Sequence, residues 1–495
     1  MSLSSSVHDI KTLILSYHPV IAMETVEEER VRSLLNEVGA AIGMPVFEWS
    51  LTRGLTRQPE GKMIHGTSDP QVMLRHLECL TVEAIFLLKD FTRHLQQPGV
   101  ARQFRELCQK FFRARSTVVL SGEAVQVPAE IEHNVAFYTL KLPGKEELKE
   151  VLQAVIQSLK ENHRFRIDLR PGDLSELLRA MGGLTLNQAR QAIAYSILED
   201  GRLDSNDITR VLDRKAQAIR EGGLLEYFPV ADNRTELGGF ANLKRWLDRA
   251  AVGFSPQAEK LNLAPPRGIM IVGVQGCGKS LAAKAIARQW RIPLLKLDAG
   301  RIYDKYVGES EKNFRKAVAM AESMAPTVLW IDEIEKGFGG GGGDQDGGLS
   351  RRLMGSFLTW MQEKRRDVFV VATANDLSVL PPEFLRKGRF DETFFVDLPE
   401  ASERQGIFRI HLKLRSQPTE KFDLEELVGA TEGFSGAEIE QAVIAALYRA
   451  LHQKRALDTG LLLEEIGQTV PLSVSRREDI LQLRQSAQGR FVSVK

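Results

Sequence analysis

The sequence predicts an α/β protein of two related halves, each a mainly parallel β-sheet core followed by a helical lid. Three observations support this fold class. Strand candidates alternate with helical segments, a glycine-rich loop joins one strand of the second half to a helix, and the two lid segments share a pattern. At 495 residues the chain is also too long for one hydrophobic core.

The strand candidates are short apolar runs separated by helical or turn-forming segments. In the first half they lie at residues 19–23, 45–49, 84–88, 117–120 and 137–140, and in the second half at residues 269–272, 293–298, 328–333, 368–375 and 394–399. A Leu-Pro pair follows or ends the last strand of each half, at residues 142–143 and 398–399.

The lid segments carry the stronger internal similarity. Residues 173–177 and 423–427 both have the pattern Asp-Leu-x-Glu-Leu, and each is followed by Gly-x-Ser/Thr-x-x-Glu/Gln. We interpret this as an internal duplication, with chance similarity of two α/β domains as the alternative. The expected order is a first module at 1–220 (core about 10–145, lid about 146–220), a linker at 221–236, a second core at 237–400, and a lid with a tail at 401–495.

A phosphate-binding loop is predicted between the strand candidate at 269–272 and an alanine-rich helix that begins near Leu281. Glycines let backbone N–H groups turn toward phosphate oxygens, and the helix N-terminus adds partial positive charge. A lysine and a hydroxyl at the end of such a loop suit the β- and γ-phosphates and Mg²⁺. A glycine turn without a ligand is the alternative. The loop consists of Gly273, Val274, Gln275, Gly276, Cys277, Gly278, Lys279 and Ser280, and Leu281, which follows it, is also expected to contact the nucleotide.

Polar residues end two neighbouring strand candidates of the second half. Asp332 and Glu333 end the run at 328–333, where side chains face the ligand crevice of a parallel sheet. We expect Asp332 to contact Mg²⁺ and Glu333 to orient the attacking water. Asn375 ends the run at 368–375 and suits the same water and the γ-phosphate. Solvated polar groups at strand ends are the alternative.

Two arginines, Arg386 and Arg389, flank Gly388 shortly after the run at 368–375. Arginines that stabilise charge on a transferred phosphate raise rates by roughly 10³–10⁵-fold, and ordinary surface charge is the alternative. Because they lie away from their own phosphate loop, we expect them to serve a neighbouring subunit, which implies a ring.

A candidate channel loop follows the strand candidate at 293–298. It consists of Lys305, Tyr306, Val307 and Gly308. In a ring, its aromatic residue would project into the central channel and grip an extended protein chain through apolar and main-chain contacts. Simple loop packing is the alternative.

The first half lacks these groups. Residues 23–29, where the phosphate loop would lie, contain no glycine and no lysine but several acids, which would repel a triphosphate. Lys89 and Asp90 take the place of Asp332 and Glu333. We therefore expect a folded first module that does not bind ATP and serves assembly, substrate docking or regulation.

Composition excludes several classes of protein. The net charge is +1, from 66 basic and 65 acidic residues, which gives no overall field to attract nucleic acid or anionic lipid. No apolar run approaches the ~20 residues of a membrane span. The cysteines Cys79, Cys108 and Cys277 have no metal-ligand spacing. Cys277 is expected to be only a small residue. A redox switch is the alternative, since a thiol at a helix N-terminus ionises more easily.

The second half resembles AAA ATPases. The resemblance lies in four motifs at residues 273–280, 330–333, 372–375 and 385–391, and it covers residues 236–450. It implies a P-loop NTPase core with a helical lid, preceded by a degenerate AAA-like module, and a hexameric, ATP-driven remodeller of proteins. It assigns Gly238, His411, Gly436 and Ala437 to the adenine and ribose side, and residues 306–308 to the channel loop. Val274 and Gln275 replace the usual Pro-Pro and leave the loop less rigid.

The whole chain also resembles the AAA proteins of unknown role found in cyanobacteria and red-type plastids, through residues 15–21 and 47–55. The expected location is the cytoplasm, or the stroma if the gene is plastid-encoded. The expected cofactors are ATP and Mg²⁺, and the expected assembly is a homo-hexamer that acts on a protein substrate. An ATP-gated assembly switch without threading is the alternative, and a nucleic-acid motor is disfavoured by the charge balance.

Overall fold

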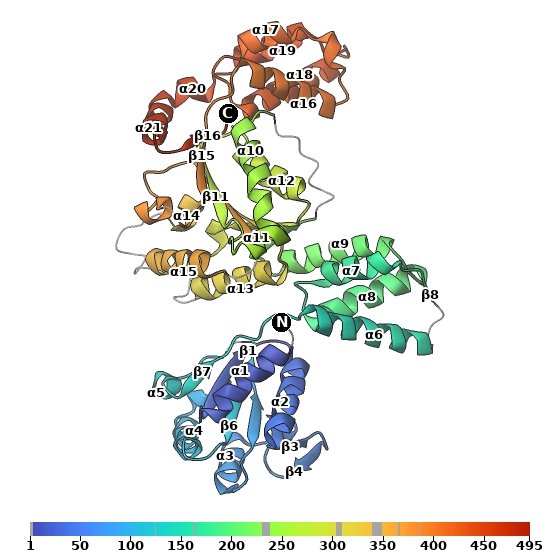
Figure 1. Ribbon diagram of the computed structural model, residues 1–495, viewed down its shortest axis with the longest axis vertical. Coiled ribbons are helices and arrows are strands. Elements are labelled where there is room, and N and C mark those ends of the chain that lie inside the picture. The colour runs from blue at the N-terminus through green and yellow to red at the C-terminus, as the bar shows by residue number, and fades with distance from the viewer. Residues whose placement is uncertain are drawn as a thin grey trace. The chain divides into compact units, whose positions relative to one another are not determined.

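The computed structural model describes residues 3–123, 125–162, 165–229, 238–302, 309–338, 349–364, 367–386 and 388–495 (Figure 1). The chain forms two compact units, Met1–Val211 and Leu212–Lys495. Each contains a β-sheet core with helices on both faces and a separate group of helices, as the sequence predicted.

The sheet of the first unit has, within the described residues, the strand order β4-β3-β2-β5-β6-β1-β7. Its strands are β1 (Val20–Glu24), β2 (Val46–Ser50), β3 (Gly54–Gln58), β4 (Lys62–Ile64), β5 (Ile85–Lys89), β6 (Thr117–Gly122) and β7 (Val135–Phe137). The strands are parallel except for the edge hairpin of β3 and β4. The sequence analysis did not predict this hairpin, because its residues are mostly polar and only Gly54 and Leu55 are buried.

Helices cover both faces of this sheet. The helices α1 (Leu3–Leu15) and α2 (Glu28–Ile42) pack on one face, and α3 (Pro70–Cys79) and α4 (Pro98–Phe111) pack on the other. The lid consists of α6 (Lys145–Asn162), α7 (Pro171–Met181), α8 (Leu186–Asp200) and the start of α9 (Asn206–Glu221), with a short pair of parallel strands, β8 (Arg166–Ile167) and β9 (Arg202–Leu203). The last core strand is β7, which ends at Phe137 and not at residue 140 as predicted.

The second unit has the sheet order β10-β12-β13-β14-β11-β15-β16. The strands are β10 (Leu225–Phe228), β11 (Gly268–Gly273), β12 (Leu294–Asp298), β13 (Thr327–Asp332), β14 (Val368–Ala374), β15 (Glu392–Val396) and β16 (Val492–Ser493). β10 is antiparallel to β12 and lies within the segment predicted as a linker. That part of the linker prediction was wrong, because Leu225 and Tyr227 alternate into the hydrophobic core.

The two sheets share one topology. In chain order, β1, β2, β5, β6 and β7 occupy the same relative positions as β11, β12, β13, β14 and β15. The first strand lies between the fourth and the fifth in both units. This shared strand order supports the internal duplication, since only the edge strands differ.

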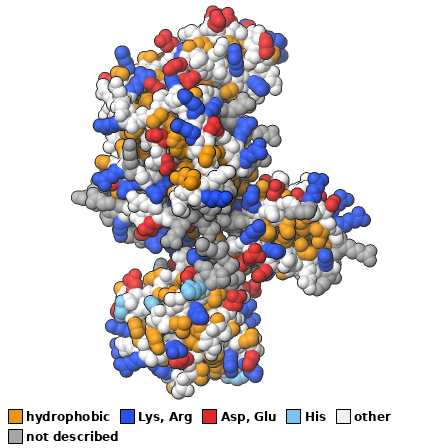
Figure 2. Space-filling view, in the orientation of Figure 1, with side chains coloured by type: hydrophobic (Ala, Val, Ile, Leu, Met, Phe, Trp, Pro, Cys, Tyr) orange, Lys and Arg blue, Asp and Glu red, His pale blue; other side chains and the backbone are white. Residues whose placement is uncertain are grey.

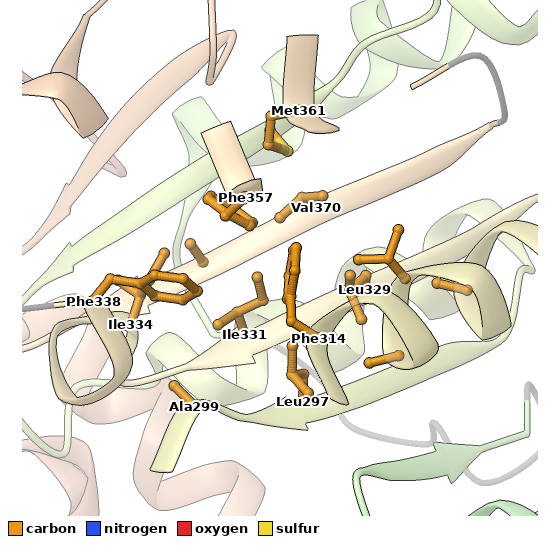
Figure 3. Close-up of a cluster of buried hydrophobic side chains, with 14 of the residues drawn as sticks. Leu297, Ala299, Phe314, Leu329, Ile331, Ile334, Phe338, Phe357, Met361 and Val370 are labelled. Carbon is orange, nitrogen blue, oxygen red and sulfur yellow. The ribbon is translucent and has the colours of Figure 1, made fainter. Parts of the chain in front are cut away.

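Aromatic and aliphatic side chains fill the space between the second sheet and two of its helices, α13 (Glu309–Ser323) and α15 (Leu349–Glu363). Figure 3 shows Phe314, Phe338 and Phe357 packed against residues of the strands such as Ile331 and Val370. The opposite face is covered by α10 (Ala241–Ala250) and α12 (Lys279–Trp290). The sheet is thus buried on both faces, as expected for parallel strands.

The second lid has its own hydrophobic core, built by α16 (Ala401–Leu414), α17 (Leu424–Ala430), α18 (Gly436–His452) and α19 (Thr459–Gln468). Two further helices, α20 (Leu472–Ser475) and α21 (Arg477–Ala487), lead to β16. None of the described helices combines the length and the apolar character needed to cross a bilayer.

Candidate nucleotide-binding site

The predicted phosphate loop connects β11 to α12, at the carboxyl edge of the second sheet. Gly273 lets the loop backbone approach the backbone of β15 closely, because a Cβ at this position would lie 2.0 Å from the carbonyl oxygen of Val396. Lys279 is 7% exposed, and its Nζ donates to the carbonyl oxygens of Gly273 and Val274 at 2.8 and 2.9 Å. Burial lowers the pKa of Lys279 to about 8.

The acidic pair lies at the carboxyl end of β13, which β14 separates from β11 in the sheet. Asp332 ends β13, and its Oδ1 accepts a hydrogen bond of 2.7 Å from the hydroxyl of Thr373 on β14. The same hydroxyl accepts the N–H of Glu333 at 3.2 Å. Glu333 has φ 48°, a left-handed conformation that non-glycine residues seldom adopt. Thr373 therefore orders both acids, and the sequence analysis missed it.

Asn375 holds the side chain of Glu333, since its Nδ2 donates to Glu333 Oε1 at 3.0 Å. The backbone N–H of Asn375 in turn donates to Glu335 Oε1 at 2.9 Å. Burial raises the pKa of Glu335. Lys336 Nζ lies 2.5 Å from Glu333 Oε2. The predicted acid and amide are therefore in direct contact, although they follow different strands, β13 and β14.

A basic residue neighbours Asp332 as well. Lys296, on β12, has its Nζ 3.2 Å from Asp332 Oδ2 and 4.5 Å from the centre of the Trp330 ring. Sequence reasoning missed Lys296, because nothing local to it indicates that β12 and β13 are neighbours.

A cavity of about 970 Å³ lies between the core and the lid of the second unit. Most of the predicted nucleotide residues line it, together with Phe240, Thr373 and Glu440. The predicted residues that line it are Gly238, Gln275, Gly276, Cys277, Gly278, Lys279, Ser280, Leu281, Asp332, Glu333, Asn375, His411, Gly436 and Ala437. Gly273 and Val274 line an adjoining smaller cavity with Asn375.

The lid reaches the loop through its longest helix. Ala437, in the first turn of α18, donates its N–H to the carbonyl oxygen of Gly276 at 3.0 Å. His411 Nδ1 lies 3.3 Å from Arg415 Nη1 and 3.5 Å from Glu440 Oε1. Burial is the main cause of the lowered pKa of His411, against the opposing charge of Glu440. A neutral imidazole at the cavity wall suits an uncharged base better than a phosphate.

The two arginines lie elsewhere. Arg386 is exposed, and Arg389 donates from Nη1 to the carbonyl oxygen of Glu383 at 2.5 Å. Neither lines the cavity. The predicted channel loop, Lys305 to Gly308, lies outside the described residues.

The corresponding place in the first unit has its charges reversed. Lys89 ends β5 opposite Ser121, as Asp332 ends β13 beside Thr373. Its Nζ lies 2.9 Å from Glu28 Oε2 at the start of α2 and 2.5 Å from Glu48 Oε1. An acid therefore begins the helix where the second unit has Lys279, and a base ends the strand where it has Asp332.

A buried ionic network joins the core and lid of the first unit. Arg30 is 7% exposed, and it pairs with Glu147 at 2.9 Å and with Glu27 at 3.2 Å. Glu27 Oε1 also accepts the N–H of Leu186, the first residue of α8, at 2.7 Å. These protein groups occupy the region that corresponds to the phosphate loop and its lid contact.

Comparison with known proteins also distinguishes the first unit from the second. Residues 269–398 match the ATPase family associated with various cellular activities (AAA), and residues 421–461 match the AAA+ lid domain. Residues 6–140 and 146–222 match the N-terminal and second domains of SpoVK-like AAA ATPases. A ycf46 AAA domain-containing protein of Trieres chinensis, described as uncharacterised, is 36% identical over 484 residues, which cover 97% of this chain and 96% of the relative. The chain belongs to the AAA ATPase family.

Other relatives of this AAA protein extend the comparison. A ycf46 protein of Pyropia yezoensis is 35% identical over 480 residues, or 96% of each chain. A cell division cycle protein 48 homologue of Archaeoglobus fulgidus is 30% identical over 322 residues, or 60% of this chain and 43% of the relative.

The AAA fold implies Mg²⁺, and the residues present fit it. Asp332 and the exposed hydroxyl of Ser280 line the same cavity, and both supply the oxygen ligands that Mg²⁺ prefers. The described residues contain no cluster of three or more His, Cys, Asp or Glu side chains that could form a full protein cage. A site of one or two protein oxygens completed by phosphates and water suits Mg²⁺.

Burial disfavours the alternative of a redox switch at Cys277. The thiol is buried, and burial raises its pKa to about 12, although the charge of Lys279 opposes the shift. Desolvation of the thiolate therefore outweighs the attraction of the Lys279 charge.

Proposed function

We propose that the second unit hydrolyses Mg-ATP within a homo-hexameric ring and uses the energy to remodel or thread a protein substrate. The observation that carries this proposal is the meeting of Lys279, Asp332 and an Asn375-bound Glu333 in one cavity between core and lid. The similarity to a cell division cycle protein 48 homologue supports the AAA family assignment on which the proposal is built.

Each residue has a defined task in this proposal. Lys279, held among loop carbonyls, is placed to neutralise phosphate charge. Asn375 and Thr373 fix the carboxylate and the backbone of Glu333, which accepts the proton of the attacking water. Ser280 and Asp332 would hold Mg²⁺, which, when bound, neutralises charge on the β- and γ-phosphate oxygens.

The Glu333→Gln variant tests the hydrolytic part. It should bind ATP with unchanged affinity and hydrolyse it about 10²–10⁴-fold more slowly, because the amide cannot accept a proton. Glu363→Gln, at an exposed position of α15, is the matched control and should hydrolyse at the wild-type rate. Unchanged turnover of Glu333→Gln would remove Glu333 from the mechanism.

In the proposed ring, arginines of one subunit complete the nucleotide cavity of the next subunit, and this sharing can be tested by mixing variants. Arg386 and Arg389 do not line the cavity of their own subunit, which is why we assign them to the neighbouring subunit. Protein with Arg386→Ala and protein with Lys279→Ala should each be inactive, whereas their mixture should regain part of the activity. A mixed ring joins an intact cavity to an intact arginine. Full activity of an isolated protomer would contradict this.

An ATP-gated switch without threading is the second candidate. Tyr306→Ala discriminates between the two, since it should abolish substrate remodelling and leave basal hydrolysis intact, with Tyr306→Phe as the conservative control. Remodelling by Tyr306→Ala at the wild-type rate favours the switch.

The substrate itself can be sought by trapping with Glu333→Gln protein in ATP and identifying what co-purifies.

A nucleic-acid motor is disfavoured. Figure 2 shows basic and acidic side chains interspersed over the visible face, in agreement with the net charge of +1. DNA-stimulated ATP hydrolysis that falls steeply with salt would revive this candidate.

We further propose that the first unit binds no nucleotide and serves assembly or substrate docking. Its reversed Lys89–Glu28 pair and its Arg30 network support this. The Lys279→Ala variant, with no other substitution, should show no binding of ATP at equilibrium. Residual binding of one ATP per chain would contradict the proposal.

A further inference from the structure

Residues 492–495, here called the strap, lie outside the regions that the family models match. Val492 and Ser493 form β16, which pairs in parallel with β15. Val494 is 1% exposed and packs in the same hydrophobic cluster as Phe240. Val494 and Lys495 both line the cavity.

The strap is bound to α10 on one side. The N–H of Asn242 donates to the carbonyl oxygen of Val494 at 3.0 Å, and its Nδ2 donates to the carbonyl oxygens of Ser493, at 3.0 Å, and of Lys495. Asn242 is in the first turn of α10, a helix end that has no side-chain cap from Phe240. The strap thus accepts a backbone N–H at the start of α10 that has no partner within the helix. The residues that precede this helix, Gly238 and Phe240, line the cavity.

The strap is bound to the lid on the other side. Lys495 Nζ lies 3.1 Å from the carbonyl oxygen of Leu398, 3.0 Å from Glu400 Oε1 and 3.4 Å from Glu403 Oε2. Leu398 is in the connection from β15 to α16, and Glu400 and Glu403 form the capping box of α16. One lysine therefore contacts both this connection, here called the hinge because it joins the core to the lid, and the start of the first lid helix.

We infer that the strap sets the angle of the lid over the nucleotide cavity, with Lys495 as the positioning residue. The strap is anchored to the core through β15 and α10, so a change in lid angle must break the contacts of Lys495 with the hinge or with α16. A ligand held between core and lid binds more tightly when the lid is already placed, because less ordering cost remains. This inference rests on the proposed nucleotide binding, which it deepens.

Calorimetric titration with Mg-ADP on the full chain tests this inference. Lys495→Ala should raise the Kd of Mg-ADP by about fivefold, as expected for loss of a partly exposed ion-pair network. KM for ATP should rise with it while kcat at saturation changes less. Lys495→Arg keeps the charge and should restore affinity. Lys421→Ala removes an exposed lysine of the same lid and should bind as the wild type does. Asn242→Ala, which releases the strap from α10, should weaken binding through the second anchor.

Hydrogen exchange without nucleotide separates this inference from the proposed function. Lys495→Ala should speed exchange in the first turns of α16 and α10, whether or not the protein binds ADP. Wild-type exchange in both turns, or an unchanged Kd in Lys495→Ala and Asn242→Ala, would overturn the role of the strap. A wild-type protein that binds no ADP would refute the proposed function. The exchange rates would still show whether Lys495 holds the strap against the lid.

Discussion

Replacing Thr373 by valine removes one hydroxyl and keeps the shape of the side chain. This hydroxyl is buried, donates to Asp332 at 2.7 Å and accepts the N–H of Glu333 at 3.2 Å. Hydrogen bonds to charged groups contribute about 1.5–3 kcal/mol, and a buried donor left unpaired costs about 1–3 kcal/mol. Part of this loss lowers the stability of the folded protein. We expect the remainder, about 1–3 kcal/mol, to raise the activation free energy of ATP hydrolysis.

In rate, that loss corresponds to a kcat about 5- to 150-fold lower, since each 1.36 kcal/mol is tenfold. The effect should appear mainly in kcat, because Thr373 positions the group that activates water. Steady-state ATP hydrolysis at saturating Mg-ATP measures it. Thr373→Ser keeps the hydroxyl and should recover most of the activity.

The matched control is Thr327→Val on β13, the strand that Asp332 ends. Thr327 is equally buried, and its hydroxyl donates to the carbonyl oxygen of Pro293 at 3.0 Å, away from the cavity. It should lower the melting temperature as Thr373→Val does and leave kcat unchanged. Equal turnover of the two valine variants would refute the assignment of Thr373.

Three further predictions concern the first unit, the loop lysine and the loop glycine. Arg30→Met leaves two buried carboxylates unpaired and should destabilise the first unit by about 3–5 kcal/mol in urea-dependent hydrogen exchange, whereas the exposed pair of Arg102 with Glu106 should contribute less than about 1 kcal/mol. Because the pKa of Lys279 is about 8, its proton is lost in the free protein above that pH, and Mg-ADP binding must then take up a proton. The Kd should therefore rise by up to about tenfold per pH unit above 8 in calorimetry, and Lys279→Arg should show a flat profile. Gly273→Ala places a Cβ against a carbonyl oxygen and should lower the stability of the second unit by about 1–3 kcal/mol or more, while Gly355→Ala, with open space around it, should be neutral or stabilising in thermal melts.

Local patterns predicted the architecture well. Buried parallel strands are continuous apolar runs, so β1, β2, β5 and β6 and the central strands of the second sheet could be located from composition alone. The edge elements could not. β3 and β4 are polar, and β16 has two residues, so each is a strand only because a neighbouring strand offers free hydrogen-bonding groups.

The same division holds for the candidate site. Glycine spacing and strand ends predicted a phosphate loop and roles for Asp332, Glu333 and Asn375, because these patterns depend on residues close together in sequence. Lys296 and Thr373 escaped notice, since each contacts Asp332 from a different strand.

By itself, the sequence determined two α/β modules, of which the second carries the glycine-rich loop at residues 273–280 and the first has no glycine at the corresponding residues 23–29. Only the tertiary structure decided which groups neighbour these residues. It placed Arg30 against Glu147, 117 residues away, and it enclosed Cys277 so that burial raises the pKa of its thiol. The physical reason is that hydrogen-bond and hydrophobic patterns repeat along the chain, whereas desolvation and ion pairing depend on groups brought together across it.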